Sequence, residues 1–456
     1  MQGFQGGKIT VLMKGKIPVD SSAESNERGE FNYSSDATAE RPLDLIVVGG
    51  GAAGFFGAIG VAQRNAALSI LILEKTPKLL TKVKVSGGGR CNVTHHCYNP
   101  FRLADHYPRG GKALKQLFKI FQASDMVEWL TSKGVDVKVE DDGRMFPGTD
   151  DSQTIIDLFL KEATTRGIQI KLNTAVLAVK QAGNSIELTC SGGIRFYAKK
   201  ILIATGGSPK PESYQWLKDI GHKVVDPVPS LFTFNDSQKK FIDLMGVAVQ
   251  SAEVKIIGTK FVSRGPVLLT HWGLSGPAVI RLSAWAAVTL KECDYQFVVH
   301  VNWTHFENED DLRSALFSMR SEKPRVKIAG NALFAIPSRL WSRLCMLSGI
   351  EDEKIWGEAS NKQINRLLES IFRCAFDVRG KTTFKEEFVT CGGIDLTEVD
   401  LGSMESRKMK NVFFAGELLN IDGETGGFNF QAAWTTAYVA ATGIAGKTPA
   451  DRIGTN

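Results

Sequence analysis

Apolar runs that end in glycine recur along this chain, and the first of them has the clearest pattern. Residues 43 to 48 read L-D-L-I-V-V, which is typical of a strand buried on both faces. Glycines follow at positions 49, 51 and 54, and a helix-like stretch continues from Ala52 to Asn65. The pattern predicts a strand, a tight turn and a helix N-terminus, an arrangement that can bind the pyrophosphate of a dinucleotide.

The three glycines have different expected roles, and a carboxylate completes the site. Gly49 permits the turn, Gly51 lets the pyrophosphate approach the backbone, and Gly54 lets helix and strand pack closely. The second apolar run, residues 69 to 73, ends in Glu74, whose carboxylate can accept hydrogen bonds from a ribose 2′-OH. A carboxylate there favours FAD or NAD over a cofactor with a 2′-phosphate.

A transmembrane helix is the alternative for this stretch, because the eighteen residues from Leu45 to Ala62 carry no charge. The six glycines among them and the strand-turn-helix punctuation favour the nucleotide-binding interpretation. We therefore expect a soluble protein that does not associate with a membrane.

Composition adds little to this picture. The chain has 456 residues, enough for two or three domains, and its apolar and charged fractions are those of a globular protein. Lys plus Arg outnumber Asp plus Glu by 55 to 49, a mild excess that suits anionic small molecules. No dense basic run is evident, so we expect a small-molecule substrate and no nucleic-acid partner. The oligomeric state is left open.

The seven cysteines are scattered and form no C-x-x-C pair, so neither a disulfide framework nor a zinc site is indicated. A reducing compartment fits best. Cys91 and Cys97 flank His95 and His96, which invites a metal interpretation, but nothing downstream supplies a matching ligand pair. We expect no metal.

Residues 1 to 41 are rich in Ser, Asn, Gly, Glu and Lys and lack strand or helix periodicity, which predicts a disordered tail or a targeting segment. Acidic residues in its second half support an organellar transit peptide only weakly, and there is no apolar secretory core. We expect an intracellular protein, in the cytoplasm or in a plastid or mitochondrion.

A glycine-rich loop follows Glu74. Ser86, Gly87, Gly88, Gly89 and Arg90 can form a loop whose N–H groups point at an anion, with the arginine adding charge. A flexible surface loop is the alternative. Next come Cys91 and Asn92, which could approach the flavin or its ribityl chain.

The middle of the chain predicts an insertion. An apolar strand that ends in Thr205, Gly206 and Gly207 is expected to return beside the first strand, and prolines from 209 onward place a domain boundary near 208. Short strand-like runs occupy 231 to 306, and a helical, charged pattern follows from 308 to about 373. The segment around His271 (T-H-W-G-L-S-G-P) makes this histidine a candidate proton donor or substrate-binding group. A lone histidine is more often structural.

The stretch from 411 to 431 contains a buried strand, acidic groups, a glycine pair and a helix N-terminus. The dipole of that helix would stabilise negative charge on the pyrimidine end of a reduced flavin. The alternative is a buried C-terminal helix that completes the core.

Taken together, the motifs V-V-G-G-G-A-A-G, S-G-G-G-R-C-N, A-T-G-G, T-H-W-G-L-S-G-P-A and F-F-A-G-E-x-x-x-x-D-G-x-x-G-G-F-N resemble those of the HI0933-like, or BaiN/RdsA-like, family of FAD-dependent NAD(P)-linked oxidoreductases. The resemblance spans about residues 42 to 447. It implies an α/β fold: a glutathione-reductase-type FAD-binding Rossmann domain (42–207 and 385–447) with an inserted β-barrel-like domain (208–306 and 373–384) and a helical subdomain (307–372).

The resemblance also implies which residues contact FAD: Gly49, Gly51, Ala52, Ala53, Gly54, Glu74, Lys75, Ser86, Gly87, Gly88, Gly89, Arg90, Cys91, Asn92, Val176, Thr205, Gly206, Gly207, Gly416, Glu417, Asp422, Gly426, Gly427, Phe428 and Asn429. His271 and Cys91 are the candidate catalytic residues.

The expected reaction is reduction of a small conjugated substrate, such as a steroid-like or polycyclic compound, by reduced FAD, with NAD(P)H as the first hydride donor. A tRNA-modifying flavoprotein is one alternative, which would need a basic surface with aromatic platforms, and a flavin-bound sensor without turnover is another. The sequence has no second G-x-G-x-x-G after a strand, so the place where NAD(P)H binds is not predicted.

Overall fold

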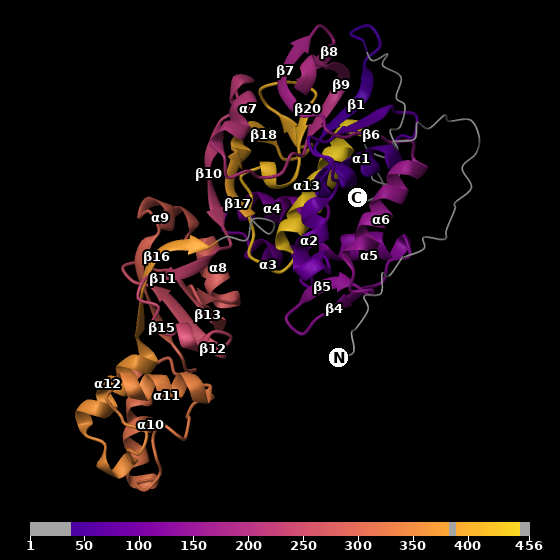
Figure 1. Cartoon of the computed structure of the whole chain (residues 1–456). Helices are drawn as coiled ribbons and strands as arrows, with labels where there is room; N and C mark the ends of the chain where they lie inside the picture. The colour runs from indigo at the N-terminus through magenta and orange to yellow at the C-terminus, as the bar shows by residue number, and fades with distance from the viewer. Residues whose placement is uncertain (1–37, 383–388, 447–456) are drawn as a thin grey trace, which may run out of the picture. The chain divides into compact units, whose positions relative to one another are not determined.

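The computed structural model describes residues 38–382 and 389–446. A mostly parallel sheet, with β1 (Leu43–Val48) at its centre, organises one part of the chain (Figure 1). Its strands follow the order β18 (Val399–Asp400), β19 (Glu405–Ser406), β20 (Val412–Phe414), β9 (Arg195–Ile203), β1, β2 (Ile70–Leu73) and β6 (Gln169–Lys171). A meander of β7 (Val176–Ala182) and β8 (Ser185–Cys190) continues from β9. We call this part, with its helices, the sheet domain.

Four parallel strands of this sheet end at the same level. Val48 is paired with Leu73 on one side and with Ile203 on the other, and Ile203 is paired with Phe414. The residues that follow these strands therefore meet at one edge, which is where ligands bind in open parallel sheets. Leu45 to Ala62, the uncharged stretch, is divided between β1 and a helix, α1 (Ala52–Arg64).

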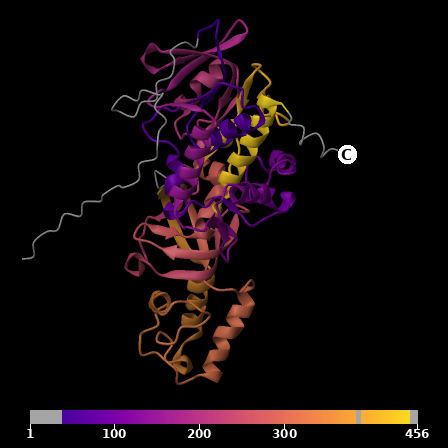
Figure 2. The same ribbon diagram turned by 90° about the vertical axis from the view of Figure 1, so that its right-hand side faces the viewer.

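Two helices cross closely beside the sheet, α1 and α13 (Phe428–Ala445), and both views show them together (Figures 1 and 2). A Cβ on Gly57 would lie 3.8 Å from that of Ala437, and one on Gly60 would lie 3.0 Å from that of Ala441. Small residues thus let the two backbones approach. The remaining helices of the domain are α2 (Thr81–Gly89), α3 (Pro100–Ala104), α4 (Gly111–Leu117), α5 (Ala123–Ser132), α6 (Ser152–Thr165) and α7 (Gln215–Asp219).

The insertion is a closed antiparallel barrel of β11 (Thr233–Asp236), β14 (Gly273–Ser275), β13 (Val262–Leu269), β12 (Ala248–Ile256), β15 (Gln296–Asn302) and β16 (Cys374–Thr382). Two helices, α8 (Pro277–Trp285) and α9 (Ala287–Glu292), follow β14. The chain enters through β10 (Val224–Ser230), which pairs with β17 (Val389–Ile394) on the way back. The expected α/β fold with an inserted barrel and helices is confirmed.

The helical segment consists of α10 (Glu309–Glu322), α11 (Ser338–Leu347) and α12 (Asn361–Phe372). Its buried side chains, such as Leu316 and Trp341, belong to the same hydrophobic cluster as Phe234 and Phe376 of the barrel strands. The sheet domain has a cluster of its own, which runs to Leu217 and resumes at Ile394. The structure thus has two cores, and barrel and helices share one of them. The expected domain boundary between 384 and 385 lies outside the described residues. Most of the expected tail, residues 1 to 41, also lies outside them.

Gly54 fixes how closely α1 approaches β1. A Cβ added there would lie 2.0 Å from the carbonyl oxygen of Gly49, so Gly54→Ala must push the helix away from the strand. We expect a loss of about 3 kcal/mol or more in the free energy of unfolding of the apoprotein, measured by denaturant titration. Gly330→Ala is the matched control, because its Cβ would meet no atom within 4 Å. Equal stability of the two variants would contradict this packing.

Candidate functional site

The three glycines of the motif, in the turn between β1 and α1, have different surroundings. Gly49 has φ +114°, and a Cβ there would lie 2.4 Å from the carbonyl oxygen of Ala204, at the end of β9. Gly54 packs against the carbonyl oxygen of Gly49. Gly51 begins α1, and a Cβ on it would meet no atom within 4 Å. The turn is therefore tight where the chain contacts itself and open in front of Gly51.

Glu74 is held beside this turn. One carboxylate oxygen accepts a hydrogen bond from the Gly50 N–H at 2.8 Å, and the other accepts from the N–H and hydroxyl of Thr76 at 2.9 and 2.8 Å. The side chain is half-buried, and Lys75 beside it is exposed. The oxygen that accepts from Gly50 has one lone pair left for a ribose hydroxyl, whereas the oxygen bound to Thr76 has both of its lone pairs engaged.

The ends of the other strands meet the same turn. Thr205 follows Ala204 directly, Gly206 faces open space, and Gly416 lies so close to α1 that a Cβ on it would be 2.8 Å from the Ala53 Cβ. Gly207 packs against Thr390. Segments far apart in the sequence are thereby brought to one edge of the sheet. Val176, the half-buried first residue of β7, contributes backbone to the meander, where it pairs with Cys190.

These residues fit FAD. The cradle in front of Gly51, which a side chain would fill, lies at the N-terminus of a 13-residue helix with no acidic residue in its first turn. Free N–H groups and the helix dipole favour a phosphate at such a position. The Glu74 carboxylate lies where a ribose is expected.

The loop of residues 86 to 92 begins within the range of α2, whose backbone is no longer helical from Ser86, and it has three consecutive glycines in the left-handed region. Gly87, Gly88 and Gly89 have φ values of +59°, +70° and +87°, and open space surrounds Gly88 and Gly89. Gly87 packs against the ring of Phe146 in β5 (Arg144–Pro147). This conformation is available mainly to glycine, which accounts for the G-G-G sequence after Ser86.

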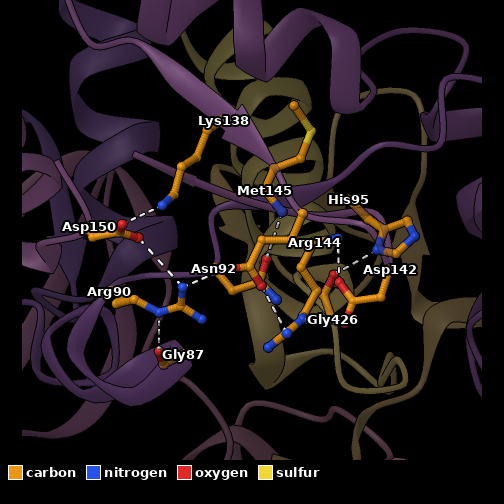
Figure 3. Close-up of polar contacts among 11 residues, drawn as sticks. Gly87, Arg90, Asn92, His95, Lys138, Asp142, Arg144, Met145, Asp150 and Gly426 are labelled. Atoms are coloured by element: carbon orange, nitrogen blue, oxygen red, sulfur yellow. Dashed lines mark hydrogen bonds and ion pairs between the residues drawn. The ribbon is translucent and has the colours of Figure 1, made fainter. Parts of the chain in front are cut away.

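Arg90 is engaged within the protein. Its guanidinium contacts Asp150 at 3.5 Å (Figure 3). It also contacts Glu140 at 2.5 Å and lies 4.0 Å above the ring of Phe146. Lys138 also pairs with Asp150. Because acidic neighbours compensate the arginine charge, an anion near this loop would depend chiefly on backbone N–H groups.

Asn92 connects the loop to the start of α13. Its side-chain amide contacts Met145 (Figure 3). When the amide is oriented to satisfy both ends, it accepts a hydrogen bond from the Gly427 N–H at 3.0 Å. A Cβ on Gly427 would lie 2.4 Å from the Thr94 carbonyl oxygen. Asn429 closes the preceding turn through two hydrogen bonds to Gly423, both 2.9 Å long.

Cys91 does not have the surroundings of a nucleophile. The side chain is fully buried, and burial raises the pKa of its thiol to about 12. The cysteine is a free thiol, like the others that the structure describes. Since the thiolate is the reactive form, we correct the expectation that Cys91 takes part in chemistry. Its φ of +62° lies in the left-handed region, directly after Arg90, which has a right-handed φ of −96°.

Two acidic residues expected at the flavin are paired with protein groups. Asp422 is completely buried, forms a bidentate ion pair with Arg109 and accepts a hydrogen bond from Ser230 at 3.1 Å. Burial raises the pKa of Asp422 and Arg109 opposes this effect. Glu417 contacts Lys82 at 2.5 Å and accepts from the Thr390 N–H. Asp422, whose side chain is fully buried, can therefore reach FAD only through its backbone.

A cluster of which sequence reasoning named only Phe428 lies where the sheet domain meets the barrel. Glu424, which is buried, accepts a hydrogen bond from the Trp285 indole at 2.5 Å and lies 3.1 Å from Nδ1 of His106 and 3.4 Å from Arg281. The His106 ring stacks on Phe428 at 4.3 Å with an angle of 15° between the planes. We call these five residues the junction cluster.

His95 borders the junction cluster. Its ring stacks on Phe428 at 4.5 Å, and its Nδ1 lies 3.1 Å from the carbonyl oxygen of Gly426 (Figure 3). Burial lowers the pKa of His95. The neutral ring therefore carries its proton on Nδ1, because the carbonyl can only accept. Among the described residues no group of histidine, cysteine and acidic side chains is arranged to hold a metal ion.

His271 lies apart from the junction cluster, and its role as a proton donor stays a prediction. At one end of β11 the Phe232 N–H donates to Ser283, two residues before Trp285. At the other end the Asp236 N–H donates to the carbonyl of Trp272, beside His271. The length of strand between these contacts is about 13 Å. His271 is exposed and adjoins the second of these contacts, not the one near Trp285.

The comparison with protein families decides the assignment. The model of the HI0933-like protein Rossmann domain matches residues 43–443. The chain belongs to the HI0933-like family. It is accordingly a flavoprotein of the FAD-dependent oxidoreductase class. No helix in the described part of this HI0933-like protein is long and apolar enough to cross a membrane.

Three relatives match this HI0933-like protein over most of their length. The ribosomal RNA dihydrouridine synthase of Escherichia coli K12 is 29% identical over 414 residues, covering 88% of this chain and 97% of the relative. The enzyme of the same name from Haemophilus influenzae is 25% identical, covering 88% and 98%. The 3-dehydro-bile acid delta(4,6)-reductase of Clostridium scindens is 24% identical, with the same coverage of 88% and 98%.

Gly51→Val tests the cradle. The new side chain enters open space in the apoprotein but occupies the place expected for the pyrophosphate, so we expect FAD affinity to fall on the order of 100-fold. Titration of FAD into apoprotein, followed by flavin fluorescence, measures the loss. The melting temperature of the apoprotein should change little, in contrast to Gly54→Ala. Wild-type affinity in the Gly51→Val variant would contradict the assignment.

Thiol labelling tests the state of Cys91. In folded holoprotein treated with iodoacetamide near pH 8, the exposed Cys293 should be alkylated and Cys91 should not, because its pKa is about 12. Peptide mapping by mass spectrometry, with denatured protein as the control in which both react, gives the answer. Cys91→Ser should keep FAD. Rapid alkylation of Cys91 in the folded protein would show an accessible thiolate.

Proposed function

We propose that this protein reduces a carbon–carbon double bond conjugated with a carbonyl group, using bound FAD and NAD(P)H as the source of reducing equivalents. The observation that carries the proposal is the pair of His106 and Glu424, part of the junction cluster. Saturating such a bond adds one hydride and one proton across it, so the protein must supply a proton donor beside the flavin. His106 is the candidate.

The geometry of the pair favours this role. Glu424 can only accept from Nδ1 of His106, which fixes the tautomer and leaves Nε2 to exchange protons. The His106 side chain is 38% exposed, whereas that of Glu424 is 9% exposed, so the acid orients the ring from behind while the ring remains accessible. A carboxylate that orients a histidine in this way is a recurrent arrangement in acid–base catalysis.

Arg281 and Trp285 add groups that a conjugated carbonyl compound needs. The Arg281 guanidinium is 42% exposed and can donate to a carbonyl oxygen, which favours the electron shift that accompanies hydride addition. The indole of Trp285 is anchored by Glu424 and is 39% exposed, which offers a flat surface for a planar substrate. Both residues come from α8 of the insertion, so the insertion contributes to substrate choice.

The names of the relatives support the same bond type. Dihydrouridine is uridine with its C5–C6 double bond saturated, and that bond is conjugated with the C4 carbonyl. A delta(4,6)-reductase of a 3-dehydro bile acid acts on double bonds conjugated with the 3-oxo group. Two different molecules thus share one reacting unit.

FAD, when bound, supplies the hydride chemistry. The residues that would hold it are Gly51 with the α1 N-terminus at the pyrophosphate, Glu74 at the ribose, and the loop of 86 to 92 with the α13 N-terminus at the ring. The N-terminus of α13, an 18-residue helix, favours negative charge nearby.

Rapid mixing tests the proton donor. Enzyme is reduced anaerobically and mixed with testosterone, a Δ4-3-ketosteroid, or with a uridine-containing oligoribonucleotide, and flavin reoxidation is followed. We expect His106→Gln to slow reoxidation by on the order of 100-fold and Glu424→Gln by a smaller factor, with FAD content unchanged. His271→Gln is the control and should react like wild type.

Two results would contradict the proposal. One is reoxidation of the His106→Gln enzyme at the wild-type rate by a substrate that the wild type reduces. The other is a wild-type flavin that neither NADH nor NADPH reduces under anaerobic conditions, which would favour a flavin-bound sensor without turnover.

A further inference from the structure

We propose that the surface formed by residues 96–102 and 112–120 binds single-stranded RNA beside His106. We call it the basic-aromatic surface. The inference rests on the proposed function for the bond that is reduced, and it names the molecule that carries this bond: a uracil within an RNA strand. It includes α3, α4 and the segments on either side of them, which all belong to the sheet domain.

Positive charge is concentrated here. Between residues 96 and 120 there are five basic residues and one acidic residue, whereas the whole chain has a net charge of +6. Two of the five basic side chains form ion pairs within the protein. The other three are exposed and make no ion pair with any residue that the structure describes: Arg102, Lys112 and Lys119. Exposed cations of this kind attract a phosphate backbone.

Exposed aromatic rings accompany these cations. Phe101 is 55% exposed and Tyr98 is 43% exposed, although large aromatic side chains are usually buried. The Lys119 ammonium lies 5.5 Å from the centre of the Phe101 ring, and His96 contacts Tyr98 edge-on at 4.8 Å. Aromatic rings next to lysine and arginine are what proteins use to stack unpaired bases while holding the phosphates.

Both segments of the basic-aromatic surface lie next to His106 of the junction cluster in the chain. His106 comes two residues after the end of α3 and so lies between the two halves of the surface in the chain. His96 follows His95, whose ring centre is 5.9 Å from that of His106. A strand lying on Phe101 and Tyr98 would therefore pass close to the proposed proton donor.

A uracil within an RNA strand would account for both the reacting bond and the charged, aromatic surface. Its C5–C6 double bond is conjugated with the C4 carbonyl, so it contains the reacting unit, and the attached sugar-phosphate chain is the polyanion that the surface fits. A free ketosteroid would need neither the lysines nor the exposed rings. The sequence-based expectation of no nucleic-acid partner relied on the dispersed charge of the whole chain. Part of that charge is concentrated between residues 96 and 120, where the fold places exposed aromatic rings beside the cations.

Fluorescence anisotropy with holoenzyme and a labelled oligouridylate tests the surface. The double variant Phe101→Ala with Lys119→Glu removes one ring and reverses one charge. The matched control, Ile257→Ala with Lys260→Glu, changes an exposed apolar side chain and an exposed lysine between β12 and β13 of the barrel. At about 0.1 M salt we expect the dissociation constant to rise at least about tenfold in the surface variant and less than about twofold in the control.

Several outcomes would overturn the proposal. They are a wild-type dissociation constant above about 100 μM at this salt concentration, equal binding in all three proteins, or equal loss in both variants. Binding to phosphatidylserine vesicles that depends on Phe101 and Lys119, without binding to the oligouridylate, would assign the surface to a membrane instead.

The binding measurement needs no turnover, so the two proposals can fail separately. Enzyme that testosterone reoxidises but that does not bind oligouridylate contradicts the RNA surface alone. Enzyme that binds oligouridylate through this surface but is reoxidised by neither compound contradicts the proposed function alone. In the surface variant FAD content and any reoxidation by testosterone should equal those of wild type, which shows that the fold is intact.

Discussion

The close approach of backbone to backbone at the β1–α1 turn is the constraint on which the rest of the site depends. Gly54 and Gly49 touch, and Gly49 in turn touches Ala204 at the end of β9. These contacts place the start of α1, the end of β9 and the Gly416 segment around one open cradle. Because each contact involves main-chain atoms, no side-chain rearrangement can compensate for an added Cβ. The cradle is a consequence of packing in the apoprotein and does not require the cofactor to shape it.

A buried ion pair then connects this edge to the insertion. Arg109 binds the buried Asp422, and its remaining nitrogen donates to the carbonyl oxygen of Ala284 at 2.7 Å. Ser230, at the entry to the barrel, binds the same carboxylate. A buried pair of this kind adds little net stability over apolar residues of similar volume, but removing one partner leaves an uncompensated charge. Its contribution is to hold the segments that carry Glu424 and Trp285 in one arrangement.

Local sequence patterns predicted most of the fold and the open cradle in front of Gly51. The strand, the three glycines and Glu74 are neighbours in the sequence, so their spacing alone indicated the turn. The junction cluster was different, because His106, Glu424 and Trp285 lie on three distant segments that only the tertiary fold brings together. Glu424 had a signal, since it lies within the D-G-E-T-G-G motif, but His106 had none. His271 stays a prediction: its local motif is suggestive, but the fold places it at the end of β11 opposite to the contact between Phe232 and Ser283.

The single core shared by the barrel and the helical segment bears on how such a protein can diversify. The chain leaves the sheet domain through β10 and returns through the adjacent β17, so both covalent connections of the insertion lie at one antiparallel pair of strands. Its interior does not merge with the interior of the sheet domain. Residues throughout the insertion can therefore be replaced as one module during evolution, exchanging the α8 side chains offered to a substrate while the cofactor-binding framework is inherited unchanged.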